Sequence, residues 1–406
     1  MMKNEKLLLE KLRKTVALCA NTNLYKDMNI RSIDIQDMSD INKLPFTTKQ
    51  GLREVYPYGA LAVPIEEVIE VHTSSGTSGK PVGSFFTKND IILGNTAIGK
   101  AWRNFGLDEN SRVMFAMRYG LFSGAPINTY ALQSLGVFVL PAGIIPIDQH
   151  ISLIIDYKID TIVGLPGYFR YLYDRLLHNK IDIDSFPLKK IIAAGEPYSE
   201  KTRQEIECNF NVEVFDHYGL AEVNTGIAYE CQQKNGLHIL DDYVIAEVVN
   251  NKDRQVVEGE DGELVLTSLE KKASPIIRYK TGDLVNWFGV VDCACGVKST
   301  KISRIQGRVD SVISIKGVKV DPYELRSSIQ DALPNTVSHG VCSFRVQNNR
   351  IDYVPKILVV SGISELEKNQ LIEFIKKKTM LNFEVETMPL SYWFDNKNKA
   401  KIVEYE

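Results

Sequence analysis

Residues 161–195 have the sequence TIVGLPGYFRYLYDRLLHNKIDIDSFPLKKIIAAG, which predicts a strand, a helix and a second strand in succession. The apolar run Thr161–Leu165 has the length and composition of a buried strand. The aromatic-rich stretch Gly167–Asn179 follows as a helix, and Ile191–Ala194 is a short strand that ends at Gly195. Strands that alternate with helices are typical of an α/β sheet with crossover helices.

The same alternation extends toward the N-terminus. Val113–Met117 and Val137–Leu140 are predicted buried strands, because both are short apolar runs. Residues 126–135 and 149–158 have the apolar spacing of helices. The predicted fold class is therefore α/β.

After Tyr243 the pattern changes to short strand-like runs between polar turns. These runs are Val244–Val249, Glu263–Ser268 and Val285–Trp287, and together they predict a mostly β subdomain. We therefore expect a large N-terminal domain, residues 1–309, made of α/β sheets and this β subdomain.

The last hundred residues have a different pattern. Strand-like runs flank two predicted helices, one starting at a proline, Pro322–Leu333, and one at Ser364–Lys378. This pattern predicts a small, mobile α+β C-terminal domain, residues 310–406. The segment Gly307–Asp310 is the candidate linker between the two domains.

Composition and charge narrow the classes of function. The chain has 406 residues, of which 44% are hydrophobic, and a formal net charge of -3. Because there is no basic excess, charge gives no support for binding nucleic acid or an anionic membrane surface. The N-terminus lacks the apolar stretch of a signal peptide. Six sparse, unevenly spaced cysteines argue against a disulfide framework, so we expect a reducing cytoplasm.

A phosphate-binding loop is predicted at residues 73–81, TSSGTSGKP, after the strand-like run Glu67–His72. Glycine lets backbone N–H groups approach phosphate oxygens closely, and the hydroxyls add further donors. Lys80 supplies a compact positive charge. The alternative of a Walker loop fails twice, because Ser74 stands where that motif needs glycine and Pro81 follows the lysine. A flexible surface turn stays open as a second interpretation.

Three later segments each carry a weak signal, and their order and spacing make them informative together. Residues 215–222 have the sequence FDHYGLAE, residues 278–283 have RYKTGD, and residues 305–310 have IQGRVD. Each segment places glycine beside charged or aromatic side chains.

With these segments in place, the chain resembles the acyl-adenylate-forming superfamily and, within it, the phenylacetate–coenzyme A ligase family. The family's loop SSGTTGKP corresponds to SSGTSGKP at 74–81, and its YGLTE segment to YGLAE at 218–222. Its RYRTxD turn corresponds to RYKTGD at 278–283, and its GRSDD hinge to GRVDS at 307–311. The resemblance extends from about residue 44 to the C-terminus.

The resemblance implies an ATP-dependent enzyme that joins a carboxylic acid to a thiol through an acyl-adenylate. The residues that it assigns to the nucleotide are Ser75, Gly76, Thr77, Ser78, Gly79, Lys80, Gly195, Glu196, Pro197, Asp216, His217, Tyr218 and Gly219. The loop would hold the departing phosphates, and the residues from Gly195 to Pro197 and from Asp216 to Gly219 would line the adenine side.

Further roles follow from the same resemblance. Glu222 would help to hold Mg²⁺, because this hard cation prefers carboxylate oxygen. Asp283 would accept hydrogen bonds from the ribose hydroxyls. Arg304 and Arg308 would steady the ribose or phosphates, although a surface ion pair is the commoner role of a lone arginine.

The C-terminal tail DNKNKAKI, residues 395–402, corresponds to the family segment whose lysine enters the site for adenylation. Alignment gives that catalytic role to Lys399, while Lys397 and Lys401 stay open as alternatives. A solvated basic tail is the other interpretation. The resemblance also makes Asp310 the hinge about which the small domain turns between the two half-reactions.

A zinc site is a separate hypothesis from residue type and spacing. Cys231 and His238 flank a polar turn, and Cys293 and Cys295 share a tight one. Some relatives bind structural zinc with this pattern, and four S/N ligands form a closed tetrahedral site. Because Cys-x-Cys is not the usual spacing, unliganded reduced cysteines stay open as the alternative.

The resemblance favours an aromatic or arylacetic acid, and Tyr119, Phe122 and Tyr168 are candidates for an aromatic-lined pocket. These aromatic residues are equally compatible with a packed core. The thiol acceptor is either coenzyme A or the pantetheine of a carrier protein. A non-catalytic nucleotide- or acyl-binding module is the alternative from another class. The sequence leaves the oligomeric state open, a homodimer included.

Overall fold

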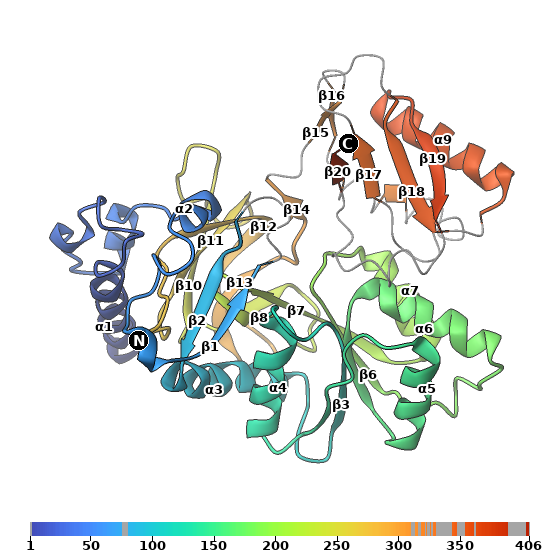
Figure 1. Ribbon diagram of the computed structural model, residues 1–406, viewed down its shortest axis with the longest axis horizontal. Coiled ribbons are helices and arrows are strands. Elements are labelled where there is room, and N and C mark those ends of the chain that lie inside the picture. Colours follow the sequence, from blue (N-terminus) through green and yellow to red (C-terminus); the bar gives the residue numbers. More distant parts are fainter. Residues whose placement is uncertain are drawn as a thin grey trace. The chain divides into compact units, whose positions relative to one another are not determined.

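The computed structural model describes residues 2–74, 80–309, 313–315, 318–320, 322, 325, 328–329, 343–346, 354–360, 363–388 and 403–405. The chain divides into two compact units, Met1–Gly143 with Phe215–Arg304 and Ile144–Val214 with Ile305–Glu406. Figure 1 shows the elements of both, with labels where there is room.

The first unit contains helices on its N-terminal side and most of the strands. Its helical elements are α1 (Met2–Cys19), η1 (Ile30–Ser32), η2 (Met38–Lys43), α2 (Lys49–Glu54), η3 (Ile65–Glu67), α3 (Lys88–Asn104) and α4 (Gly124–Ser134). Its strands are β1 (Val68–Thr73), β2 (Gly83–Thr87), β3 (Arg112–Ala116), β4 (Phe138–Leu140), β7 (Glu213–Leu220, from Phe215 on), β8 (Asn224–Glu230), β9 (Leu237–Ile239), β10 (Val244–Val249), β11 (Asp261–Ser268), β12 (Tyr279–Asp292) and β13 (Lys298–Ile302).

Antiparallel pairing connects most strands of the first unit, in the order β10-β11-β12-β13-β9-β8-β7. β3 and β4 pair in parallel, and β1 and β2 form a separate antiparallel pair. Buried and half-buried residues alternate along the first half of β12, as expected for a strand with one covered face.

Aromatic side chains fill the core of the first unit. The Trp102 ring of α3 packs edge-on against Phe105 and Phe115, and Phe105 packs on Phe215 of β7. All four side chains are almost completely buried. This cluster holds α3 against the strands, because aromatic rings remove a large apolar area from water.

The start of α3 is fixed by its sequence and by a distant segment. Thr87 and Asp90 form a capping box, in which each side chain accepts a hydrogen bond from the backbone N–H of the other. Asp90 also accepts hydrogen bonds from the N–H groups of Lys272 and Ala273, at 2.6 and 3.0 Å. The helix start therefore anchors the segment between β11 and β12.

The second unit begins with the strand–helix–strand pattern predicted from the sequence. Its elements here are α5 (Ile147–Asp156), β5 (Thr161–Gly164), α6 (Pro166–His178), β6 (Lys190–Ala194) and α7 (Glu200–Phe210). β5 and β6 pair in parallel. Pro166 occupies the first turn of α6, where its missing N–H costs nothing.

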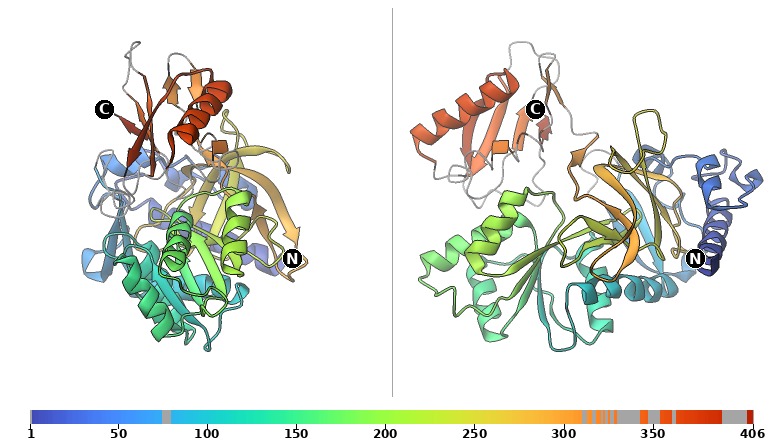
Figure 2. Two further views of the ribbon diagram at one scale, coloured as in Figure 1. Left: turned by 90° about the vertical axis from the view of Figure 1, so that its right-hand side faces the viewer. Right: turned by 180° about the vertical axis from the view of Figure 1, so that it is seen from behind.

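The C-terminal part of the second unit is a small α+β arrangement (Figure 2). Its elements are β14 (Gly307–Arg308), β15 (Ile313–Ile315), β16 (Val318–Val320), β17 (Ser343–Val346), β18 (Lys356–Val360), α9 (Glu365–Thr379), β19 (Glu384–Met388) and β20 (Val403–Tyr405). Its four-stranded sheet has the order β19-β18-β17-β20. Leu371 and Ile375 of α9 share a buried cluster with Ile357, Val359 and Val385 of the sheet.

The predicted α/β fold class with a β subdomain and a small α+β region is confirmed. The predicted boundary between a domain of residues 1–309 and one of residues 310–406 stays a prediction, and its hinge residue Asp310 lies outside the described residues.

Candidate active site and metal centre

The predicted phosphate loop connects β1 to β2. Residues 75–79, which are Ser75, Gly76, Thr77, Ser78 and Gly79, lie outside the described part of the chain, whereas both ends of the loop are described. The Ser74 N–H donates to the Val82 carbonyl at 3.0 Å, and the Val82 N–H donates to Ser74 Oγ at 2.9 Å. Lys80 is exposed. The loop is therefore closed at its base by an antiparallel pair of strands, and its one lysine faces solvent.

A buried lysine links the strand after this loop to the YGLAE segment. Lys271, only 3% exposed, donates to Ser84 Oγ in β2 and to the Val223 carbonyl at 3.2 Å. Its Nζ also lies 4.5 Å from the centre of the Phe86 ring. Burial lowers the pKa of Lys271 to about 8, against the opposing charges of Asp90 and Glu222. Nothing in the sequence marks Lys271, because a single lysine has no periodic signal.

Glu222, the predicted magnesium ligand, is a buried carboxylate with a cation beside it. It is 6% exposed, and one of its carboxylate oxygens lies 3.1 Å from Lys49 Nζ. Lys49 begins α2, which Thr48 caps by accepting a hydrogen bond from Gly51 N–H. The side chain of Lys49 is 42% exposed, whereas that of Glu222 is 7% exposed, so the ion pair joins a buried anion to a cation that reaches solvent.

The YGLAE and RYKTGD segments meet directly. The Tyr218 hydroxyl donates to Asp283 Oδ2 at 2.6 Å, and Asp283 is buried. Thr281 Oγ1 accepts from the Asp283 N–H at 3.0 Å, which fixes the turn. Gly219 allows close approach of β7 and β8, because a Cβ there would lie 2.2 Å from the Gly226 nitrogen. The predicted ribose ligand is thus held next to the predicted adenine wall.

Asp216 and His217, the neighbouring residues on β7, have different surroundings. Asp216 pairs with Arg304 at 3.0 Å, which joins two of the predicted nucleotide residues. The His217 side chain is buried against the rings of Trp102 and Phe105. Burial lowers the pKa of His217 to about 4. The His217 imidazole therefore belongs to the aromatic core of this unit.

Arg278 fixes the start of the RYKTGD turn through contacts with distant segments. It adopts the left-handed backbone conformation with φ of 43° and is buried. Its guanidinium bonds both carboxylate oxygens of Glu247, at 2.8 and 3.1 Å, and the Leu44 carbonyl at 3.0 Å. Its carbon Cζ lies 4.0 Å from the centre of the Phe46 ring. These contacts offset the conformational strain of the left-handed backbone at Arg278, which precedes Asp283 in the chain.

The remaining predicted residues are divided between the two units. Gly195 directly follows β6 and has φ of +87°, which favours glycine. Glu196, Pro197 and Arg308 are half-buried. Tyr119 and Phe122 are half-buried in the first unit, where Tyr119 bonds Thr129 Oγ1 at 2.7 Å.

Tyr168, on the second unit, is buried, and its hydroxyl bonds His150 Nδ1 at 3.0 Å. Lys399, with its alternatives Lys397 and Lys401, lies outside the described residues.

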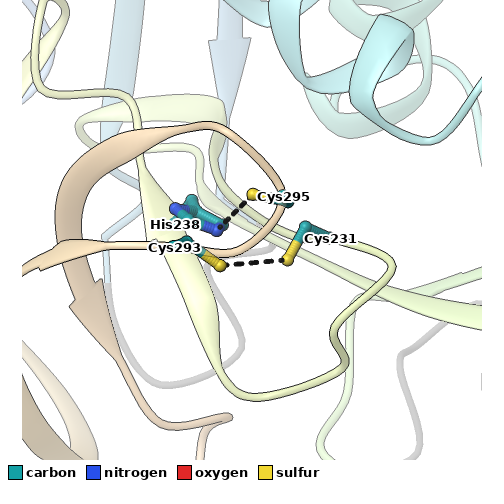
Figure 3. A group of neighbouring side chains, drawn as sticks. All are labelled: Cys231, His238, Cys293 and Cys295. Carbon is teal, nitrogen blue, oxygen red and sulfur yellow. Dashed lines mark hydrogen bonds between the residues drawn. The ribbon is translucent and has the colours of Figure 1, made fainter.

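The four predicted metal ligands lie together in the first unit (Figure 3). Cys231 follows β8, His238 lies in β9, and Cys293 and Cys295 lie in the turn between β12 and β13. Their ligand atoms all lie within 4.8 Å of one another. The sequence thus brings together four metal-binding side chains from two hairpins.

The distances in this cluster suit a tetrahedral metal. The Cys231 and Cys293 sulfurs are 3.9 Å apart, and Cys295 Sγ lies 3.4 Å from His238 Nε2. A tetrahedral zinc with Zn–S near 2.3 Å places its sulfur ligands about 3.8 Å apart. Burial, together with the charge of Lys301, lowers the pKa of His238 to about 4, which leaves the neutral imidazole that binds metals.

Ser299 fixes the orientation of the histidine. Its hydroxyl lies 2.7 Å from His238 Nδ1, so Nε2 points to Cys295 and the other cysteines. Such a partner on the second ring nitrogen is usual for a metal-bound histidine. Ser299 carries no signal in the sequence, because its role depends on the pairing of β13 with β9.

In the part of the chain that the structure describes, no helix is long and apolar enough to cross a membrane.

Comparison with known proteins gives the family. The family of AMP-binding enzymes matches residues 10–269. Phenylacetate-coenzyme A ligase of Escherichia coli (strain K12) is 35% identical over 302 residues, which cover 73% of this chain and 68% of that protein. Phenylacetate-coenzyme A ligase of Pseudomonas putida is 34% identical over 299 residues, covering 73% and 67%.

The fold is also similar to a solved structure, 2-hydroxyisobutyryl-CoA ligase in the postadenylation state with 2-HIB-AMP. The TM-score is 0.85 over 100% of this chain and 90% of that chain, at 20% identity. At this identity the likeness supports the fold alone. From the sequence matches, the chain belongs to the AMP-binding enzymes and, within them, to the phenylacetate–coenzyme A ligase family of AMP-forming acid–thiol ligases predicted from its motifs.

Proposed function

We propose that this chain activates an aromatic or arylacetic acid with ATP and transfers the acyl group to coenzyme A. The acid's carboxylate attacks the α-phosphorus, which forms the acyl-adenylate and releases pyrophosphate. The thiol then attacks the acyl carbonyl, which forms the thioester and releases AMP. The observation that carries the proposal is the Tyr218–Asp283 hydrogen bond, because it brings two family motifs into contact on one unit.

Each motif has a role in the first half-reaction. Residues 75–80 hold the departing phosphates, Asp283 accepts hydrogen bonds from the ribose, and Asp216 with Arg304 supports the wall beside it. Glu222 would hold Mg²⁺, which would supply positive charge to offset the negative charge that develops on the phosphates. The burial of Glu222 and its pairing with an exposed lysine suit a site that exchanges cations.

The acid class rests on the relatives and on two side chains. The similar proteins are named for phenylacetate. Tyr119 and Phe122 are half-buried, so they offer partly accessible aromatic surface to an aryl group. Tyr168 is buried against His150, so its ring belongs to the packed interior of the second unit rather than to an open pocket surface.

The second half-reaction needs the C-terminal part of the chain. We place the hinge at Asp310 and the adenylation lysine at Lys399, on the family resemblance. The small domain then withdraws Lys399 after adenylation and admits the thiol.

Zinc is the second proposed metal, bound by Cys231, His238, Cys293 and Cys295. The cluster distances support it, and the ion would tie the β8–β9 hairpin to the β12–β13 hairpin. Zinc in a closed Cys₃His site contributes to folding and not to the reaction. Because three thiolate ligands need reducing conditions, this site also favours the cytoplasm.

The test is acid-dependent formation of AMP and pyrophosphate by the purified chain with ATP, Mg²⁺ and a panel of carboxylic acids. We expect arylacetic acids to give the highest rates, with thioester formed on free coenzyme A. Thioester only on a pantetheinylated carrier protein would instead support the alternative acceptor. Nucleotide binding with no turnover of any acid would support the non-catalytic module and overturn the proposal.

A further inference from the structure

A buried lysine lies beside the cysteine–histidine cluster. Lys301 is in β13 directly opposite His238 of β9, and it is only 1% exposed. Its Nζ lies 4.0 Å from Cys293 Sγ. Among the described residues, no carboxylate oxygen lies within the 4.0 Å that would make an ion pair with this ammonium.

Such a lysine needs a negative partner. Transfer of an ammonium from water to a protein interior costs several kcal/mol unless an opposite charge compensates it. The group in contact with Lys301 that can carry negative charge is the Cys293 sulfur, and the Cys231 sulfur lies 3.9 Å from that atom. As thiols they are neutral, so the reduced and metal-free cluster leaves the lysine uncompensated.

Metal binding changes this balance. A divalent cation with three thiolates and one neutral imidazole has a net charge of −1, because the three thiol protons leave for solvent as the metal enters. One ammonium at the edge of the cluster brings the total to zero. The Cys₃His ligand set and one buried lysine are therefore complementary in charge.

We propose that Lys301 is the built-in counter-charge of this metal centre, and that the centre assembles as a neutral unit of metal, three thiolates, histidine and lysine. The inference rests on the zinc site of the proposed function. It adds a positioning residue that touches no substrate and acts through Cys293.

Strand β13 supplies both supports of the site. Ser299 and Lys301 are two residues apart, so their side chains lie on the same face of the strand. Ser299 orients the His238 ring, and Lys301 balances the charge of the sulfur ligands. The four ligands themselves come from other segments. A soft, thiolate-binding divalent metal such as Zn²⁺ fits this set, and hard cations that prefer oxygen do not.

The test uses the full chain with Lys301→Met, which keeps the length of the side chain and removes its charge. Zinc affinity is measured by competition with a chromophoric chelator, and Lys298→Met is the control, because Lys298 is an exposed lysine on the same strand. We expect Lys301→Met to bind zinc about 10–100-fold more weakly, the usual cost of losing an outer partner of a metal site. Lys298→Met should bind as the wild type does.

A second variant keeps the counter-charge testable if Lys301→Met fails to fold. Cys295→His changes the ligand set to two thiolates and two imidazoles, which is neutral with a divalent metal. The double variant Lys301→Met/Cys295→His should therefore recover solubility and zinc binding relative to Lys301→Met. No recovery would overturn the counter-charge.

Two failures are distinguishable. A wild-type protein that binds no zinc refutes the metal site itself. A wild-type protein that binds zinc, with Lys301→Met binding as tightly as Lys298→Met, leaves the metal site in place and refutes the role of Lys301.

Discussion

At the residue scale, individual lysine side chains connect the segments that form the candidate site. Lys271 connects β2, just after the phosphate loop, with Val223, just after Glu222. The glycine-rich loop, YGLAE and RYKTGD were predictable from the sequence, because several residues of fixed type occur together. Lys49, Lys271 and Lys301 were not, because only the folded chain shows that each lysine lies beside a specific carboxylate, carbonyl or thiol.

Replacing Lys271 tests this connection. Lys271→Met should raise the KM for MgATP and slow adenylation about 10–100-fold, since hydrogen bonds to a charged group contribute about 1.5–3 kcal/mol. Transfer to coenzyme A from added acyl-adenylate should be nearly unchanged. Lys272→Met is the matched control, because Lys272 is an exposed neighbour paired with Glu67. Equal loss in both half-reactions would reduce Lys271 to a purely structural role.

The buried His217 makes the free energy of unfolding depend on pH. Its folded-state pKa, about 4, is lower than the ordinary 6.5, so the unfolded chain binds a proton more readily between these values. The contribution of the neutral ring to the free energy of unfolding is fully present above pH 6.5 and is lost as pH falls toward 4. Denaturant unfolding at pH 7 and pH 4.5 should show wild type losing up to about 3 kcal/mol relative to His217→Phe. A constant difference between the two proteins would contradict this.

At the element scale, local patterns predicted elements of both the β subdomain and the α/β part. The predicted strand Val244–Val249 matches β10, and the predicted helix 126–135 corresponds to α4, Gly124–Ser134. β12 was predicted only over Val285–Trp287, although it spans Tyr279–Asp292. Thr281, Gly282 and Asp283 lie at an irregularity in the pairing with β11, between the paired residues Lys280 and Leu284. This pairing on both sides and the contact of Arg278 with Leu44 are long-range effects that the local sequence does not show.

Zinc content and thermal stability test whether a metal ion joins the β8–β9 hairpin to the β12–β13 hairpin. Purified protein should contain about one zinc per chain, as expected for one closed site, and Cys293→Ser should lose it. Chelation should lower the Tm, because metal binding contributes free energy of folding. Cys208→Ser is the control, since Cys208 is an exposed cysteine on α7 of the other unit. Full zinc content in Cys293→Ser would remove the proposed ligand set.

At the scale of the whole molecule, the mechanism that we propose requires a different arrangement of the chain for each half-reaction. Lys399→Ala should slow adenylation about 10²–10³-fold, as expected for one preorganised charge at the transition state. Transfer of the acyl group from supplied acyl-adenylate should be largely spared. Lys397→Ala and Lys401→Ala, measured in parallel, identify which lysine of the tail acts. If every variant loses both half-reactions together, alternation of the small domain is wrong.

The ion pair between Lys49 and Glu222 has a consequence for how each cycle begins. Because this carboxylate is already paired with a side chain that is 42% exposed, a magnesium ion bound by Glu222, as we propose, would exchange with an ammonium and would not meet a bare anion. The protein without magnesium is thereby spared an unbalanced buried charge, and the displaced lysine would remain beside the incoming polyphosphate, to which its own charge is attracted.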